Sequence, residues 1–423
     1  MGASGHKAAG VPVSGTGRNF RIGTFKALQH RNFRLLWIAL TVSAVGTWMQ
    51  IVAQSLLVLK LTHGSAMALG TVSLVQALSF LLFAAAGGGV ADRIDKRRLL
   101  LATQGIMMGF AVLLGVLTAT GAVRFWMVPL VAFGSGATLS FDQPTRNALI
   151  AALVPKENLM NAVSLNSAVF NGASILGPAL AGLTLSRIGY AGNFFLNAAS
   201  FLAVLAVLPL LRIPAGRAMA RPGGRLLESV REALQYVRRD AVLPSVILAY
   251  GALLFFGPSP ALALPLYAVQ ILRAGPAQLG MLFSAVGAGT VLGALTVASL
   301  GDFPHKARLV FGAILVWTAA VAVFGTSESL RLSIPALFIL GAAQNAAGAT
   351  TMTLLQTRVP PEMRGRAMSL NTLLIMCVRP LGDFPAGAVI GRFGFRPTVL
   401  LGATLVGTAL LAVFIARPAA PSA

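Results

Sequence analysis

Charged residues are so sparse in this chain that long uncharged stretches separate them, and this spacing limits the possible folds more than any other feature. Eleven stretches approach or exceed the roughly 20 residues that a helix needs to cross a bilayer. They are residues 37–59, 61–91, 99–123, 125–141, 158–186, 188–211, 241–272, 274–301, 309–327, 332–357 and 397–416. A twelfth stretch, 367–391, is interrupted by two charges, Arg379 and Asp383.

The composition assigns these stretches to membrane helices. Charged residues make up 10% of the chain and hydrophobic residues 56%, whereas a soluble domain carries about 25% charge. Within lipid, only helices and closed barrels satisfy their backbone groups, and barrel strands would alternate over about 10 residues. We therefore predict an all-α membrane protein with twelve transmembrane helices, which lies in the lipid bilayer.

The net charge of +22 is a topology signal rather than a mark of nucleic-acid binding. With twelve helices, most of the 33 Lys and Arg residues fall in the tails and in every second loop. The positive-inside rule then places both termini in the cytoplasm. No nucleic-acid recognition module accompanies the charge. One cysteine, Cys377, and four scattered histidines give no disulfide or metal site, and we expect no cofactor.

An internal repeat divides the chain into two halves. The segments that match at an offset of 205 residues are Val154-Pro155-Lys156-Glu157 with Val359-Pro360-Pro361-Glu362, and Ser164-Leu165-Asn166 with Ser369-Leu370-Asn371. The register continues through the pairs Gly177 and Gly382, Gly182 and Gly387, Arg187 and Arg392, and Gly189 and Gly394. An offset of six helices preserves orientation, so the halves are parallel repeats.

The region between the halves reads as a linker. Residues 212–224 are rich in Pro, Gly and Arg, which is typical of a flexible segment. Residues 225–240 follow helical amphipathic spacing, as expected for a helix on the cytoplasmic surface. We expect a basic tail (1–32), a six-helix bundle (33–211), a cytoplasmic linker (212–240), a second six-helix bundle (241–417) and a C-terminal tail (418–423).

The loop after the second span resembles the signature loop of the major facilitator superfamily. It reads Gly88-Gly89-Val90-Ala91-Asp92-Arg93-Ile94-Asp95-Lys96-Arg97-Arg98, with Asp95 where a glycine is common. Further segments are similar to the drug–proton antiporter branch, which includes exporters of enterobactin-type siderophores and macrolides. These are Gly46-Thr47-Trp48-Met49-Gln50, Leu61-Thr62-His63-Gly64-Ser65, Phe141-Asp142-Gln143-Pro144-Thr145-Arg146-Asn147 and Asn161-Ala162-Val163-Ser164.

The resemblance covers about residues 25 to 415 and sets several expectations. It implies two six-helix bundles around a central cavity, alternating access, and proton-driven export as a monomer in the bacterial inner membrane. It also implies that Asp92 and Arg93, with the basic residue Arg97 of the same loop, latch the cytoplasmic ends of neighbouring helices.

Arg379 and Asp383 are the sharpest candidates for mechanism. A charge at mid-bilayer costs at least ~2.5–3.5 kcal/mol, so it needs a partner or a water-filled cavity. Spaced i, i+4, the two residues share one helix face. Burial disfavours a charged carboxylate and a neighbouring guanidinium favours it, so Asp383 is our candidate proton carrier and Arg379 its partner. The alternative is a permanent ion pair that fixes the helix.

Asp142 is a second candidate proton site. It follows the last residue of the fourth uncharged stretch, with Arg146 at i+4 and Pro144 in a position that suits a helix start. The alternative, which we favour at this point, is a gate or cap residue at the inner end of the fourth helix. Arg146 joins Asp92, Arg93 and Arg97 as a candidate cytoplasmic gate.

Polar and aromatic residues near the middle of several spans are candidates for substrate binding. They are Gln50, Gln54, Asn171, Phe255, Phe256, Gln344 and Asn345. Amides combined with aromatic rings suit an amphiphilic organic substrate, although for any single one of these residues we favour interhelical hydrogen bonding or packing as the explanation.

These residues favour a proton-coupled exporter of amphiphilic molecules or drugs, with a narrow exporter of a siderophore or lysolipid as the alternative. A membrane-embedded lipid-modifying enzyme would need clustered His, Asp or Glu near one membrane face. The 11 acidic residues lie mostly in loops, so we do not expect an enzyme.

Overall fold

The computed structural model describes residues 25–211, 226–301 and 303–416, and all regular structure within these ranges is helical. The helices of the first half are α1 (Arg31–Leu61), α2 (Ala66–Arg93), α3 (Lys96–Ala119), α4 (Met127–Leu153) and α5 (Leu159–Val207). Those of the second half are α6 (Leu226–Arg239), α7 (Leu243–Phe256), α8 (Pro260–Leu266), α9 (Pro276–Leu300), α10 (Lys306–Thr326), α11 (Leu330–Arg358), α12 (Arg364–Leu373), α13 (Arg379–Phe393) and α14 (Phe395–Ala416). The flexible linker 212–224, the C-terminal tail 418–423 and residues 1–24 of the predicted N-terminal tail lie outside these ranges.

Ten segments within the described residues are long and apolar enough to cross a membrane, which confirms the prediction of a helical membrane protein. One of them, Lys156–Leu210, contains two helices, because α5 changes direction at Gly189, where φ is 66°. The 27-residue helix α4 is not among the ten. The predicted total of twelve spans and the cytoplasmic termini stay predictions.

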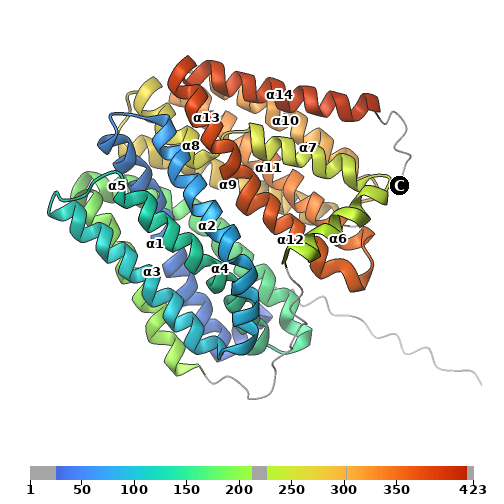
Figure 1. The fold of residues 1–423 in the computed structure, drawn as a ribbon, viewed down its shortest axis with the longest axis horizontal. Helices are drawn as coiled ribbons and strands as arrows, with labels where there is room; N and C mark the ends of the chain where they lie inside the picture. Colours follow the sequence, from blue (N-terminus) through green and yellow to red (C-terminus); the bar gives the residue numbers. More distant parts are fainter. Residues whose placement is uncertain (1–24, 212–225, 302, 417–423) are drawn as a thin grey trace, which may run out of the picture.

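The two halves of the chain form two groups of helices (Figure 1). Helices α1–α5 gather in one group, drawn in blue to green, and α7–α14 gather in the other, drawn in yellow to red. The largest contacts between the groups join α5 to α9 and α2 to α13. Because the repeat relates α5 to α13, these two contacts are equivalent in the two halves.

The repeat is visible in backbone detail. The 3-10 turns Lys156–Asn158 and Pro361–Met363 stand at the same offset, and so do the two glycines that end the following helices, with φ of 66° at Gly189 and 87° at Gly394. L-residues with a side chain rarely adopt such angles. The sequence repeat is therefore a structural repeat.

The two bundles meet through one half of their length. At the α2–α13 contact, a Cβ on Gly387 would lie 2.7 Å from the Ala66 carbonyl oxygen. At the α5–α9 contact, a Cβ on Gly182 would lie 2.8 Å from the Pro276 carbonyl oxygen. Ala66 and Pro276 begin α2 and α9, next to loops that the charge distribution places outside, and we call this end of the molecule the outer end. Both close contacts therefore lie at the end that the charge distribution predicts to be outside.

Helix α6 is the predicted amphipathic helix, and it packs on the second bundle. Among its described side chains, Ala233 and Val237 are buried. Its Tyr236 hydroxyl donates to the Arg358 carbonyl at 3.1 Å, and its Glu232 pairs with Arg366. Arg358 and Arg366 lie at the inner ends of α11 and α12, so α6 is bound to the inner face of that bundle.

Candidate functional site

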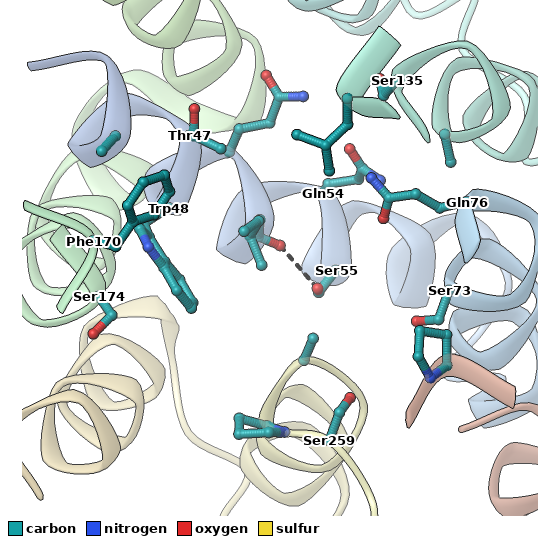
Figure 2. A pocket seen from close by; sticks show the side chains of 18 of the residues that line it. Thr47, Trp48, Gln54, Ser55, Ser73, Gln76, Ser135, Phe170, Ser174 and Ser259 are labelled. Atoms are coloured by element: carbon teal, nitrogen blue, oxygen red, sulfur yellow. Dashed lines mark hydrogen bonds between the residues drawn. The ribbon is translucent and has the colours of Figure 1, made fainter. Parts of the chain in front are cut away.

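A cavity of about 660 Å³ lies between the two bundles. Both bundles contribute to its wall, which combines amides, hydroxyls and aromatic rings. The part formed by α1, α2, α4 and α5 presents Thr47, Trp48, Gln54, Ser73, Gln76, Ser135, Phe170 and Ser174 (Figure 2), and Ser259 projects from the opposite bundle. Such a wall can hold a molecule that is partly apolar and partly hydrogen-bonding.

Most of the predicted site residues line this cavity. They are Gln50, Gln54, Asp142, Arg146, Asn171, Gln344, Arg379 and Asp383. These residues come from α1, α4, α5, α11 and α13, so the fold brings together positions far apart in sequence. The repeat is also visible in the cavity wall, because Ser174 and Arg379, which correspond at the offset of 205, both line the cavity.

Three predicted substrate residues lie outside the cavity wall. The Phe255 and Phe256 carbonyls pack against Gly382 and Gly402, and the two rings contact each other edge to face at 5.1 Å. The Asn345 side-chain oxygen is buried without a hydrogen-bond partner in the described structure. The sequence placed these residues in spans that face the cavity, but it did not fix the rotation of each helix.

Asp142 lies in the wall of the cavity and is only 2% exposed. One carboxylate oxygen accepts hydrogen bonds from Thr103 Oγ1 at 2.9 Å and from Gln104 Nε2 at 2.7 Å, both from α3. The other oxygen lies 3.2 Å from Arg146 Nη2. The Arg146 guanidinium also lies over the Phe170 ring at 5.0 Å. The charge is thus neutralised and hydrogen-bonded within one bundle.

The prediction that Asp142 ends the fourth helix is wrong. Helix α4 continues to Leu153, and Pro144 lies inside it rather than at a helix start. A charge marked the end of the uncharged stretch, but the network around Asp142 supplies the partners that allow a buried carboxylate within a helix. Arg146 accordingly lies in the cavity wall.

Asp383 is the buried carboxylate that the other bundle contributes to the cavity wall, and it is 3% exposed. Its carboxylate accepts a hydrogen bond of 2.9 Å from the backbone N–H of Ser259. Ser259 stands in the break between α7 and α8, where its hydroxyl accepts from Leu262 N at 3.2 Å. A broken helix leaves backbone N–H groups without partners, so Asp383 satisfies one of them.

The backbone of Asp383 lies at the contact between the bundles. A Cβ on Gly70 of α2 would be 2.7 Å from the Asp383 carbonyl oxygen. Before Asp383, the span contains a π-helical turn at Leu374–Val378, directly ahead of Pro380. Proline removes a backbone donor, which accounts for an irregular turn at this place.

Arg379 lines the cavity, but it does not form the predicted ion pair. Among the described residues, no hydrogen bond or ion pair joins its guanidinium to Asp383 or to another side chain. The carboxylate that we expected as its partner is engaged by Ser259 instead.

Two wall features were missed in the sequence. The Gln50 side-chain oxygen Oε1 accepts a hydrogen bond from Asn197 Nδ2 at 2.6 Å, so the side chain of this predicted substrate residue already links α1 to α5. Gln76 of α2 lies near Gln54 in Figure 2, and both line the cavity. Its signal was an amide within an apolar span, which we had used for α1 but not for α2.

The predicted cytoplasmic gate is described only in part. The side chains of Asp92 and Arg93 lie outside the described residues. Arg97 Nη2 donates to the Pro209 carbonyl at 2.6 Å, which ties α3 to the end of α5 within its own bundle. Asp95 caps α3 by accepting from Arg98 N at 2.9 Å, which explains an acidic residue at that position.

Comparisons with known proteins agree with this architecture. Residues 22–421 match the family described as transmembrane secretion effector. The enterobactin exporter EntS of Citrobacter koseri is 27% identical over 386 residues, which cover 91% of this chain and 90% of that protein. The EntS protein of Escherichia coli O1:K1 is 26% identical over the same length.

Solved transporter structures share the fold at low identity. A bacterial homologue of the human lysosomal transporter Spinster, inward-facing and unoccupied, superposes with a TM-score of 0.72 at 15% identity, covering 92% of this chain and 97% of that one. A bacterial homologue of the iron transporter ferroportin, also inward-facing, gives 0.71 at 17% identity, with 91% and 98% covered. Both are described as inward-facing.

Proposed function

The chain belongs to the transmembrane secretion effector family of major facilitator transporters, and from this premise we propose that it exports amphiphilic organic molecules in exchange for protons. It is a multi-pass protein of the bacterial inner membrane, and its relatives include exporters. Transport proceeds by alternating access, in which the outer contacts open as the inner ends close. A monomer contains both bundles and the whole cavity.

The cavity supports an amphiphilic substrate. Aromatic rings such as Trp48 and Phe170 lie in the same wall as the amides of Gln54 and Gln76 (Figure 2). A volume of about 660 Å³ is within the range of sites that hold drug-sized molecules. Rings and amides together bind by stacking and hydrogen bonding without requiring one fixed shape.

The proposal of proton coupling rests on the position of Asp383. This residue lines the cavity, contacts the break between α7 and α8 through Ser259, and lies at the α2–α13 interface through its backbone. Ionised Asp383 accepts the Ser259 N–H and holds the broken helix in the outer-closed state. Protonation removes the negative charge and weakens this charge-assisted bond, so proton binding at Asp383 is coupled to the position of the broken helix.

Export of a siderophore is the second candidate. It is favoured by the relatives named enterobactin exporters, which are 26–27% identical over nine tenths of the chain. Under this candidate the same cavity serves one polar aromatic molecule rather than many.

The test is efflux from bacterial cells that lack their main drug pumps. Cells are loaded with fluorescein, through its diacetate, or with rhodamine 123, and they express the wild type, Asp383→Asn, or the control Glu328→Gln at matched levels. Glu328 is an exposed carboxylate that pairs with Arg396 outside the cavity. We expect the wild type and the control to speed efflux of at least one dye, a protonophore to abolish it, and Asp383→Asn to lack it.

Other outcomes point elsewhere. Asp383→Asn could export the dye as fast as the wild type and remain sensitive to the protonophore. Asp383 would then not be the proton carrier, and Asp142 would be the next candidate. A well-expressed wild type that exports neither dye contradicts broad efflux. Secretion of a catecholate siderophore, measured as iron-binding activity in the medium, then tests the narrow alternative.

A further inference from the structure

The charges in the cavity wall do not balance locally. Four charged residues line the cavity, namely Asp142, Arg146, Arg379 and Asp383. Asp142 and Arg146 pair at 3.2 Å, and the carboxylate of Asp383 accepts the Ser259 N–H. Arg379 is left as the cation of the wall without a hydrogen bond or ion pair among the described residues.

An unpaired guanidinium at this place is costly unless something binds it. Arg379 lies halfway along the Arg364–Phe393 segment, one of the candidate membrane spans. Charged side chains at such depth pair with one another or face water, and they mark substrate pathways. Asp383 lies one helical turn away, but one of its carboxylate oxygens accepts the Ser259 N–H, and no ion pair or hydrogen bond joins it to Arg379 among the described residues. The donors of Arg379 therefore remain available to a molecule in the cavity.

We propose that Arg379 is an anion-binding subsite, and that the molecules carried in this cavity are aromatic organic acids with a carboxylate, sulfonate or phenolate group. This inference rests on the proposed transport function and names its substrate class. A guanidinium presents five donors in a planar fork that matches such groups in a bidentate geometry. The acidic group binds Arg379, and the apolar body lies along the aromatic part of the wall.

Two dyes with the same ring system and opposite charge test the proposal directly. Fluorescein is an anion and rhodamine 123 is a cation, and both contain a xanthene core. Binding is measured by fluorescence anisotropy with the purified full chain in phosphatidylcholine nanodiscs, without a proton gradient. The variants are Arg379→Gln, Arg379→Lys and the control Arg392→Gln. Arg392 is exposed on the same helix and lies outside the cavity wall.

We expect Arg379→Gln to lose binding affinity for one of the two dyes only. Removing a charge-assisted contact lowers affinity about 10- to 100-fold. The affinity of Arg379→Gln for fluorescein should therefore fall by this factor, while its affinity for rhodamine 123 should be at least that of the wild type. Arg379→Lys should retain part of the fluorescein affinity because it keeps the charge. The control should match the wild type for both dyes.

A competition on the wild type keeps the proposal testable if Arg379→Gln does not fold. Benzenesulfonate should displace bound fluorescein, and benzyltrimethylammonium at the same concentration should not. The proposal is overturned if both compounds displace it equally, if Arg379→Gln binds fluorescein like the wild type, if both dyes are lost together, or if the wild type does not bind fluorescein.

The two proposals fail separately in these experiments. Fluorescein binding through Arg379 without any efflux contradicts proton-coupled export and leaves the anion subsite intact. Proton-coupled efflux of rhodamine 123 by a protein that does not bind fluorescein contradicts the anion subsite and leaves the transport function intact.

Discussion

A single methyl group at the outer contact should shift the protein toward the outward-open state. Gly387 of α13 packs so closely on α2 that a Cβ would lie 2.7 Å from the Ala66 carbonyl oxygen and 3.2 Å from the Met67 Cα. Both neighbours are backbone atoms, which cannot rotate away as a side chain can. Gly387→Ala therefore pushes α2 and α13 apart at the contact that closes the cavity on this side.

The magnitude follows from the cost of overpacking. Adding a methyl to a tightly packed contact costs about 1–3 kcal/mol. The outward-open state separates these helices and avoids the cost, so the ratio of outward to inward populations should rise about 5- to 150-fold. Gly391→Ala is the matched control, since a Cβ there meets nothing within 4 Å. Both substitutions gain the same helix propensity, about 1 kcal/mol, so their difference isolates the contact.

Cysteine accessibility measures the shift. Ser73 lines the cavity on α2, and Cys377 is the only native cysteine. Ser73→Cys in a Cys377→Ser background is labelled on intact cells with a membrane-impermeant maleimide, which reaches the cavity only from outside. Labelling should be several-fold faster with Gly387→Ala than with Gly391→Ala. Equal rates in the two variants would refute the argument that this contact holds the outer end closed.

Three further predictions concern stability and the linker helix. Asp142→Asn leaves the buried Arg146 guanidinium without its counter-ion, so we expect the free energy of unfolding in detergent to fall by about 3 kcal/mol, and a loss below 1 kcal/mol would contradict the buried pair. Arg366→Ala removes an ion pair with Glu232 in which both side chains are nearly half exposed, so it should cost less than about 1 kcal/mol in the same assay. Ala233→Asp places an unpaired charge on the buried face of α6, so protease cleavage of this helix should become faster, while unchanged cleavage would indicate that α6 is not held on the second bundle.

The sequence predicted the helices and the repeat well, because both depend on local chemistry. Lipid requires that a helix satisfies its own backbone groups, so an apolar stretch of sufficient length predicts a span without knowledge of its neighbours. The matched glycines Gly189 and Gly394 recur with positive φ because each repeat turns at the same place. The amphipathic helix between the halves was predicted by its spacing for the same reason.

The candidate site was predicted in its residue types and only partly in its contacts. Charged and amide residues in apolar spans pointed to the cavity, and Asp142, Arg379 and Asp383 all line it. Their partners did not follow from spacing. The i, i+4 relation holds for Asp142 and Arg146 and fails for Arg379 and Asp383, because the break between α7 and α8 offers Asp383 a backbone N–H.

By itself, the sequence determined that this is a helical membrane protein built from two related halves, because hydrophobic length, charge placement and internal repetition are properties of the chain. The tertiary structure alone decided which end of the cavity is closed, which arginine is paired, and which side chains face the substrate path. These features depend on how the helices rotate and pack against one another, and a residue such as Ser259, 124 positions from Asp383 along the chain, becomes its partner only in the folded protein.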